Sequence, residues 1–135
     1  MAAEFELHSQ LAADTVFLED WPLSRVLLLN DARYAWLVLV PRRMGLSELH
    51  DVTPADRVAL TDEVMRASES LKRLTGAAKI NTGALGNLVP QLHIHVVARA
   101  PGDPAWPGPV WGHSPAQPYS AAALEQQLVR LRGRL

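Results

Sequence analysis

The chain lacks cysteine, a long apolar run and an excess of charge of either sign, and each absence removes a class of function. Without cysteine there are no disulfides and no thiol chemistry, which is compatible with a reducing cytoplasm. A formal net charge of −1 argues against a general nucleic-acid surface, although a local anion site stays open. No apolar run approaches the ~20 residues that span a bilayer, so we expect a cytoplasmic protein with no membrane contact and no nucleic-acid partner.

The pattern of apolar and polar residues predicts a single domain over residues 1–135 that mixes helices and strands. Six of the ten prolines fall in residues 101–118, so this Pro/Trp-rich segment should be irregular, with a C-terminal helix within residues 119–135. The expected elements are a short helix within residues 1–20, strands near Thr15–Leu18, at Arg25–Leu29, Ala35–Val40, Ala77–Asn81 and Gln91–Ala98, a long helix over residues 53–75, and a last helix over Ser120–Arg134.

The long helix has the clearest local signals. Thr53 is a suitable N-cap, Pro54 fits the first helical position, and Gly76 fits the end of a helix. Between them, apolar residues recur at steps of three and four, which gives the helix one face that can pack on a core: Leu60, Val64, Ala67, Leu71 and Leu74.

Two histidines lie two residues apart in the last expected strand. Alternation along this strand puts Gln91, His93 and His95 on one face, while apolar residues occupy the other. Residues two apart on a strand are separated by ~6.5–7 Å, so both imidazoles can reach one small polar group. The strand therefore carries a candidate site on the face that is not used for the core.

Three chemical interpretations compete for this histidine pair. It can hold zinc, for which His50, His113 or Asp31 would supply the third ligand. It can act by nucleophilic attack at phosphorus. It can also be two histidines without chemistry, each bonded to backbone groups. The preceding loop favours phosphate, since Gly83 and Gly86 let backbone N–H groups approach an anion, and two amide side chains nearby can donate to it: Asn81 and Asn87.

These residues resemble the histidine triad (HIT) family of nucleotide hydrolases and transferases. Its signature is three histidines alternating with apolar residues, preceded by a glycine segment. Here residues Gly86–Pro90 take the place of the glycine segment, and Gln91–Val97 take the place of the triad. The family follows its third histidine with two apolar residues and soon an arginine, and His95 is followed in the same way by Val96, Val97 and Arg99.

The resemblance implies an α+β fold, with a mainly antiparallel sheet of about five strands, the long helix packed on it, and a C-terminal helix. It implies reaction at the α-phosphate of a nucleoside phosphate derivative, of the dinucleoside polyphosphate or nucleoside phosphoramidate type, through a nucleotidyl-histidine intermediate. It also implies a homodimer that binds a small nucleotide substrate and uses no cofactor and no metal at the histidines.

Residue by residue, the resemblance makes His93 the nucleophile and His95 the third histidine. Gln91 replaces the first histidine; its main-chain carbonyl would still hold the nucleophile, but its side chain cannot titrate near pH 7. Leu88 stands where the family usually has Ser or Thr at the leaving group, and the loss of such a donor typically costs ~10²–10³ in rate. The residues expected to bind the nucleotide or its phosphates are Asn81, Gly86, Asn87, Asn30, Asp31 and Arg99.

Alternatives remain for the function and for some of these residues. A nucleotide-binding regulatory module with little turnover would use the same pocket, and the substitutions at Gln91 and Leu88 favour it. A zinc-dependent hydrolase would need a third ligand. Asn30 and Asp31 are equally explained as turn residues, and Arg99 as the partner of an ion pair.

Overall fold

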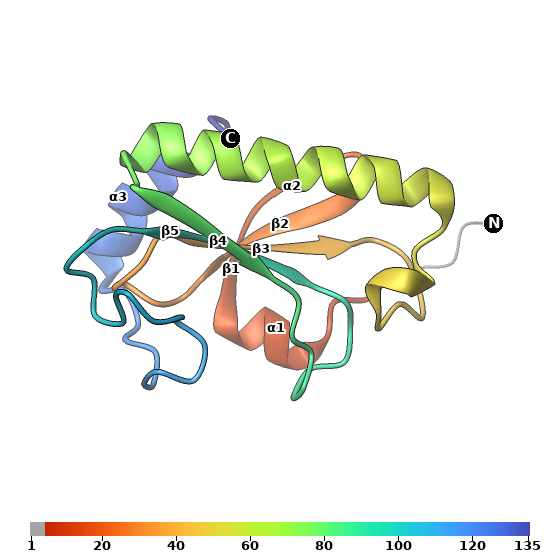
Figure 1. Ribbon diagram of the computed structural model, residues 1–135, viewed down its shortest axis with the longest axis horizontal. Helices are drawn as coiled ribbons and strands as arrows, with labels where there is room; N and C mark the ends of the chain where they lie inside the picture. Colours follow the sequence, from red (N-terminus) through yellow and green to blue (C-terminus); the bar gives the residue numbers. More distant parts are fainter. Residues whose placement is uncertain (1–4) are drawn as a thin grey trace.

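The computed structural model describes residues 5–135 and is built on a five-stranded antiparallel sheet (Figure 1). The helices are α1 (Ser9–Asp14), α2 (Pro54–Thr75) and α3 (Ala121–Leu131), with one turn of 3₁₀ helix, η1 (Leu49–Asp51). The strands, in the spatial order β1-β2-β3-β5-β4, are β1 (Thr15–Asp20), β2 (Ser24–Leu29), β3 (Trp36–Pro41), β4 (Lys79–Gly83) and β5 (Ile94–Arg99). The predicted α+β class is confirmed.

The long helix α2 forms where its end signals predict. The Thr53 side chain accepts a hydrogen bond from the Asp56 N–H, and Gly76 ends the helix with a φ of 69°, which glycine adopts at little cost. Of the predicted apolar face, three residues are buried, namely Leu60, Ala67 and Leu71, and Val64 and Leu74 pack partly buried beside them. Figure 1 shows α2 running across one face of the sheet, with α1 on the other side.

The sheet has a hydrophobic layer on each face. Under α2, the layer includes Leu28, Leu39 and Val96. On the opposite face, Val38 and Val97 pack with side chains from residues 101–118, a segment of turns with neither helix nor strand. The histidines belong to this second face, because alternate residues of β5 point to opposite sides.

Strand β5 begins at Ile94, three residues later than predicted. The partner strand β3 ends at Pro41, and Ile94 pairs with Leu39, so an extension of β5 would meet a residue that has no N–H to donate. The backbone N–H of Leu92 instead donates to the Leu46 carbonyl, 2.9 Å away. Gln91 and His93 therefore lie in the connection that leads into β5.

Smaller differences occur at other boundaries. Strand β4 is shifted two residues later than predicted, to Lys79–Gly83, and α3 ends at Leu131 rather than Arg134. The first helix covers only Ser9–Asp14, and of the residues predicted to form it, residues 1–4 lie outside the described part of the chain. No helix within residues 5–135 is long and apolar enough to cross a membrane.

Candidate active site

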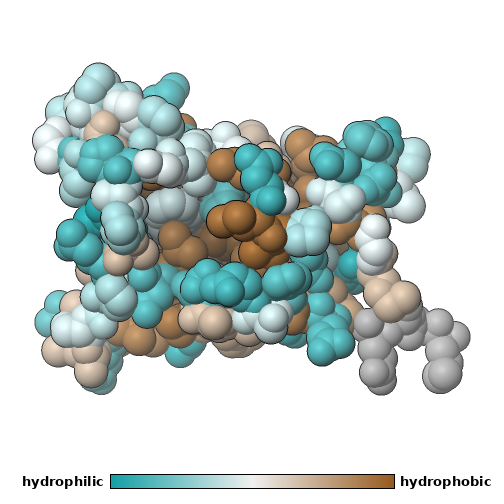
Figure 2. All heavy atoms as spheres, turned by 90° about the horizontal axis from the view of Figure 1, so that it is seen from below, coloured by the Kyte–Doolittle hydropathy of each residue, from teal (hydrophilic) through white to brown (hydrophobic). Residues whose placement is uncertain are grey.

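His93 and His95 lie side by side on the sheet face opposite α2. Their ring centroids are 4.9 Å apart, with the planes at 73°. Both residues are buried, at 6% and 9% exposure, and neither packs into the core under α2. Figure 2 views this face of the molecule, which is hollowed at its centre, with hydrophobic residues inside the hollow and hydrophilic residues around it.

A main-chain hydrogen bond sets the tautomer of His93. Its Nδ1 lies 2.7 Å from the carbonyl oxygen of Gln91. A carbonyl oxygen can only accept, so Nδ1 carries the proton and Nε2 of the neutral ring keeps a lone pair. This nitrogen is the one that can attack an electrophile.

His95 has the opposite arrangement. The indole Nε1–H of Trp36 donates to His95 Nδ1 at 2.9 Å, so the proton of the neutral imidazole sits on Nε2. Burial, and to a lesser extent the neighbouring His93, lower the pKa of His95 to about 4. At neutral pH, His95 is therefore an uncharged hydrogen-bond donor.

His93 opens into a small cavity of about 120 Å³. The glycine loop lines one part of it through Gly86, whose φ of 75° requires glycine, and η1 lines another part through His50. Pockets that enclose whole small molecules usually reach about 300–1,000 Å³, so this cavity fits a phosphoryl group but not a nucleoside. His95 does not line this cavity, although its ring lies 4.9 Å from that of His93.

The side chain of Gln91 holds the N-terminal segment in place. Its Oε1 accepts from the His8 N–H at 2.8 Å, and its Nε2 donates to the Glu6 carbonyl at 2.9 Å. Both polar atoms of the side chain are thus engaged by residues 6–8. The main-chain carbonyl of Gln91 is the part that contacts His93.

Arg99 and Asn81 lie away from the histidines and bind each other. Arg99 is four residues beyond His95 on β5, about 13 Å away by the rise of a strand. Its buried guanidinium donates to Asp103 through Nε and Nη2, to Asn81 Oδ1 at 2.7 Å, and to the Gly108 carbonyl. All three nitrogens have partners, so Arg99 ties segment 101–118 to the sheet.

Asn30 and Asp31 occupy the turn between β2 and β3 and contact the chain itself. Asn30 Oδ1 accepts from the Tyr119 N–H at 2.9 Å. Asp31 is 1% exposed and forms an ion pair with Arg33. Burial opposes ionisation of Asp31, but the hydrogen bonds and charge of Arg33 outweigh it and lower the pKa of the carboxyl. These contacts are those of a structured turn.

Asn87 and Leu88 are at the exposed tip of the glycine loop. Leu88 is 96% exposed, so it makes almost no contact with the rest of the described chain. Asn87 is exposed beside it. Neither residue lines the cavity at His93, which this loop contacts through Ala84, Leu85 and Gly86.

The three side chains suggested as further zinc ligands are dispersed. The His50 side chain is 83% exposed on η1, His113 bonds Ser114 Oγ, and Asp31 pairs with Arg33. Within residues 5–135, no three side chains of His, Cys, Asp or Glu come together as a metal site.

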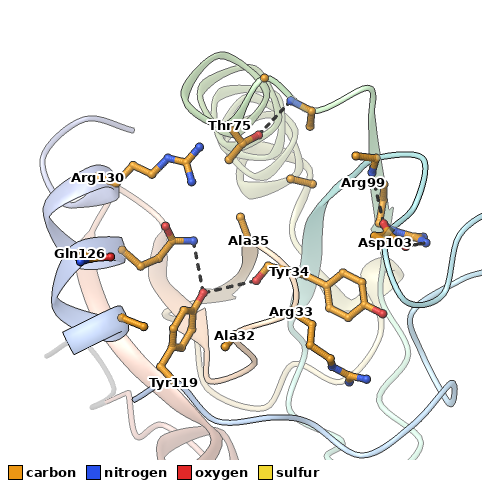
Figure 3. Close-up of a pocket in the computed structure, with 16 residues that line it drawn as sticks. Ala32, Arg33, Tyr34, Ala35, Thr75, Arg99, Asp103, Tyr119, Gln126 and Arg130 are labelled. Atoms are coloured by element: carbon orange, nitrogen blue, oxygen red, sulfur yellow. Dashed lines mark hydrogen bonds and ion pairs between the residues drawn. The ribbon is translucent and has the colours of Figure 1, made fainter. Parts of the chain in front are cut away.

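A larger cavity, about 490 Å³, lies at the other end of β5, and the histidines do not line it. Arg130 of α3 and Arg99 of β5 lie on opposite sides of it (Figure 3). Its charged groups already have partners: Arg99 pairs with Asp103, Arg33 pairs with Asp31, and Arg130 donates to the Leu74 carbonyl. We therefore assign the candidate site to the smaller cavity, which His93 lines.

Trp36 and Trp111 contact His95 and were not predicted for the site, whereas Gly83, predicted as part of the anion-binding loop, ends β4 opposite His95. The indole N–H of Trp36 bonds Nδ1 of His95, and the ring of Trp111 packs edge-on against the His95 ring, with 5.7 Å between the centroids. Gly83 pairs with His95 across β4 and β5, and a Cβ at this position would lie 3.3 Å from Trp111 Cη2. The even spacing of Trp36 and Val38 in β3 is the sequence signal that could have put Trp36 on this face.

Comparison with known proteins connects this arrangement to a family. The HIT domain family model matches residues 10–102, which are 93 of the 135 residues. The histidine triad protein of Bradyrhizobium japonicum is 44% identical, with 98% of both chains covered and a TM-score of 0.94. The histidine triad protein of Sinorhizobium meliloti is also 44% identical, with 97% of both chains covered and a TM-score of 0.93. No curated protein matches the chain.

A third solved structure extends this likeness. The histidine triad protein of Marinobacter aquaeolei is 43% identical, covers 98% of this chain and 97% of its own, and has a TM-score of 0.95. Since these relatives cover nearly the whole chain, the likeness includes residues 103–135, beyond the part that the family model matches. The chain belongs to the histidine triad (HIT) family.

Proposed function

We propose that this HIT-family chain is a nucleotidyl hydrolase or transferase that uses His93 to attack the α-phosphate of a nucleoside phosphate derivative. The hydrogen bond from His93 Nδ1 to the Gln91 carbonyl carries this proposal, because it leaves a lone pair on Nε2. His95 Nε2–H supplies the complementary group, a donor for a phosphate oxygen. In this proposal, Gln91 stands in place of the family's first histidine through its main-chain carbonyl.

The reaction proceeds by two displacements at the same phosphorus. In the first, the Nε2 lone pair of His93 forms a bond to the α-phosphorus, and the bond to the leaving group breaks with its electron pair. In the second, water or another acceptor attacks phosphorus, the phosphorus–nitrogen bond breaks, and its electron pair returns to Nε2. The proton of the attacking water passes to solvent.

The substrate is of the dinucleoside polyphosphate or nucleoside phosphoramidate type. The reacting phosphoryl group would sit at the mouth of the cavity of about 120 Å³, beside His93 and Gly86, so that backbone N–H groups of the loop hold one oxygen and His95, whose ring lies 4.9 Å from that of His93, holds another. Asn87, exposed on the same loop, would add a further donor. The nucleoside extends outside this cavity, along the hollowed face seen in Figure 2.

The test is direct detection of the covalent intermediate. Purified protein is incubated with a diadenosine polyphosphate, an adenosine phosphoramidate or a nucleotide sugar, and its intact mass is measured after rapid quenching. We expect an adenylyl adduct on His93 that is absent from His93→Ala and retained in His113→Ala, a control at an exposed histidine. Near-normal turnover by His93→Ala, or loss of turnover on chelation of metal, would contradict the proposal.

A second candidate is a nucleotide-binding regulatory module with little turnover. The observation that favours it is the loop tip, where the exposed Leu88 offers no hydrogen bond to a leaving group. Calorimetry separates the two candidates. A regulatory module would bind nucleotide tightly and yield neither the adduct nor product, whereas the enzyme yields both.

We also propose that the chain forms a homodimer through α2 and the edge strand β4. An open apolar groove of about 300 Å³ runs between them, lined by Leu60, Val64, Met65 and Ile94 among others. Met65 is 57% exposed there, and β4 is an edge of the sheet whose outer side has unpaired backbone groups. Sedimentation at micromolar concentration should give a dimer for the wild type and a monomer for Met65→Lys; a wild-type monomer would refute this.

A further inference from the structure

Trp36 makes a hydrogen bond to an active-site histidine that neither the sequence nor the family match accounts for. Its indole Nε1–H donates to His95 Nδ1 at 2.9 Å, and the two rings meet edge-on at 5.6 Å between centroids. Trp36 is 7% exposed and His95 is 9% exposed, so water does not compete freely for this bond. An indole N–H has no acceptor function, and therefore it selects one tautomer of its partner.

The hydrogen bond from Trp36 is the polar contact of His95 Nδ1, and the other neighbours of the ring pack against it. The ring is packed by Trp36 from β3, by Trp111 from segment 101–118 and by His93, and Gly83 lies opposite it on β4. Of these four residues, only His93 has an ionisable side chain. Burial and then His93 lower the pKa of His95 to about 4, and both causes act in the direction that the indole bond requires.

We propose that Trp36 is a positioning residue that holds His95 as a neutral Nε2–H donor and so assigns different tasks to the two histidines. With a proton on Nε2, His95 cannot attack phosphorus and instead donates to a phosphate oxygen. His93, bonded at Nδ1 to a carbonyl, keeps the attacking lone pair. The tautomer of His95 is independent of the proposed function, whereas its task at phosphate rests on it.

The structure contains a matched control in Trp111. Its ring also packs edge-on against His95, at 5.7 Å, and edge-on against Trp36, at 6.3 Å. Its buried Nε1, however, has no hydrogen-bond partner within residues 5–135. Trp36→Phe removes the N–H that bonds His95, and Trp111→Phe removes one that bonds no side chain, while both variants lose similar ring area.

The test is the tautomer and titration of His95, followed by NMR in ¹⁵N-histidine-labelled protein between about pH 4 and pH 8. In the wild type we expect the neutral Nε2–H form across most of this range. Trp36→Phe should give a mixture of tautomers and raise the pKa of His95 by about one unit, and Trp111→Phe should leave the Nε2–H form in place. An Nδ1–H tautomer in the wild type would overturn the proposal even if Trp36→Phe does not fold.

A second measurement tests the task at phosphate. With an adenylated substrate, Trp36→Phe should lower kcat about tenfold with little change in KM, and should move the acidic limb of the pH–rate profile to higher pH. Trp111→Phe should keep the wild-type profile, and Trp36→His, which restores an N–H donor, should recover part of the loss. An equal effect of both phenylalanine variants would reduce Trp36 to a packing residue. Absence of any turnover in the wild type would refute the proposed function alone and leave the NMR result standing.

Discussion

The imidazoles of His93 and His95 hold their protons on opposite nitrogens, although their rings are only 4.9 Å apart. The difference comes from outside the pair, because one ring bonds a carbonyl acceptor and the other bonds an indole donor. Because His95 is held neutral, the pair avoids the repulsion that two imidazolium ions at this distance would have. The site thereby offers one lone pair and one proton at neutral pH.

The pH dependence of stability should report the buried, neutral state of His95. Its pKa is lowered from 6.5 to about 4, so between these values the unfolded chain binds a proton that the folded chain does not. The stability that His95 contributes is complete above pH 6.5 and is lost as the pH falls towards 4, by about 3 kcal/mol in all. Urea unfolding of the wild type and of His95→Gln should show this loss in the wild type only. If the free energy of unfolding fell equally with pH in both proteins, the prediction would be contradicted.

Removal of the Gln91 side chain should affect stability more than chemistry. Gln91→Ala deletes two hydrogen bonds to residues 6–8 and leaves the main-chain carbonyl that holds His93. We expect a loss of about 1–3 kcal/mol in the free energy of unfolding and an adduct rate within a few-fold of wild type. Gln91→His, which restores the family's histidine and keeps the same main-chain carbonyl, should keep activity equal or higher. Thermal unfolding and adduct kinetics measure the two effects, and a collapse of adduct formation in Gln91→Ala would give the side chain a chemical task.

The leaving group should decide the rate. A phosphoramidate expels an amine that needs a proton, while a phosphoanhydride expels a phosphate that does not. At the loop, the exposed Leu88 has no proton to give, and the Gln91 side chain is engaged elsewhere. We therefore expect faster turnover of diadenosine polyphosphates than of adenosine phosphoramidates. Leu88→Ser should raise the phosphoramidate rate by about 10-fold to 100-fold and change the anhydride rate little, as followed by chromatography of AMP release. Equal acceleration of both substrates would refute this.

The ion pair of Arg99 and Asp103 should be essential for stability. The Arg99 side chain is 1% exposed, so Asp103→Asn leaves a buried charge without its counter-charge and should cost about 3–5 kcal/mol. The control is Asp20→Asn, which breaks the half-exposed pair with Arg25 and should cost at most about 1 kcal/mol. Chemical unfolding compares the two variants. If Asp103→Asn changed nucleotide affinity at unchanged stability, Arg99 would belong to the binding site instead.

Local signals predicted the fold well. Thr53, Pro54 and Gly76 set both ends of α2 through caps that a few neighbouring residues determine. Alternation was enough to place His95 on the face away from this helix, and His93 lies beside it although it precedes the strand. These features depend on residues close in the sequence, and they could be predicted without knowledge of the tertiary structure.

The partners of the site residues depend on the tertiary structure, and they could not be predicted from local signals. Trp36 and His95 are 59 residues apart, and their bond requires the register of β3 against β5. Arg99 follows the histidines as the family pattern expects, yet Asp103 and Asn81 engage its guanidinium. The start of β5 differs from the predicted one for a similar reason, because Pro41 on the neighbouring strand limits how far β5 can pair.

The close approach of Gly83 to Trp111 links two distant parts of the chain in evolution. A Cβ at position 83 would lie 3.3 Å from the indole of Trp111 that packs on His95, so a larger residue there would press this indole by a few tenths of an ångström, and a smaller residue at position 111 would relieve the contact. Relatives that keep an indole at 111 should therefore favour glycine at 83, and larger residues at 83 should occur mainly beside smaller residues at 111. This coupled pair offers a way to divide the family into members with and without an indole over the third histidine.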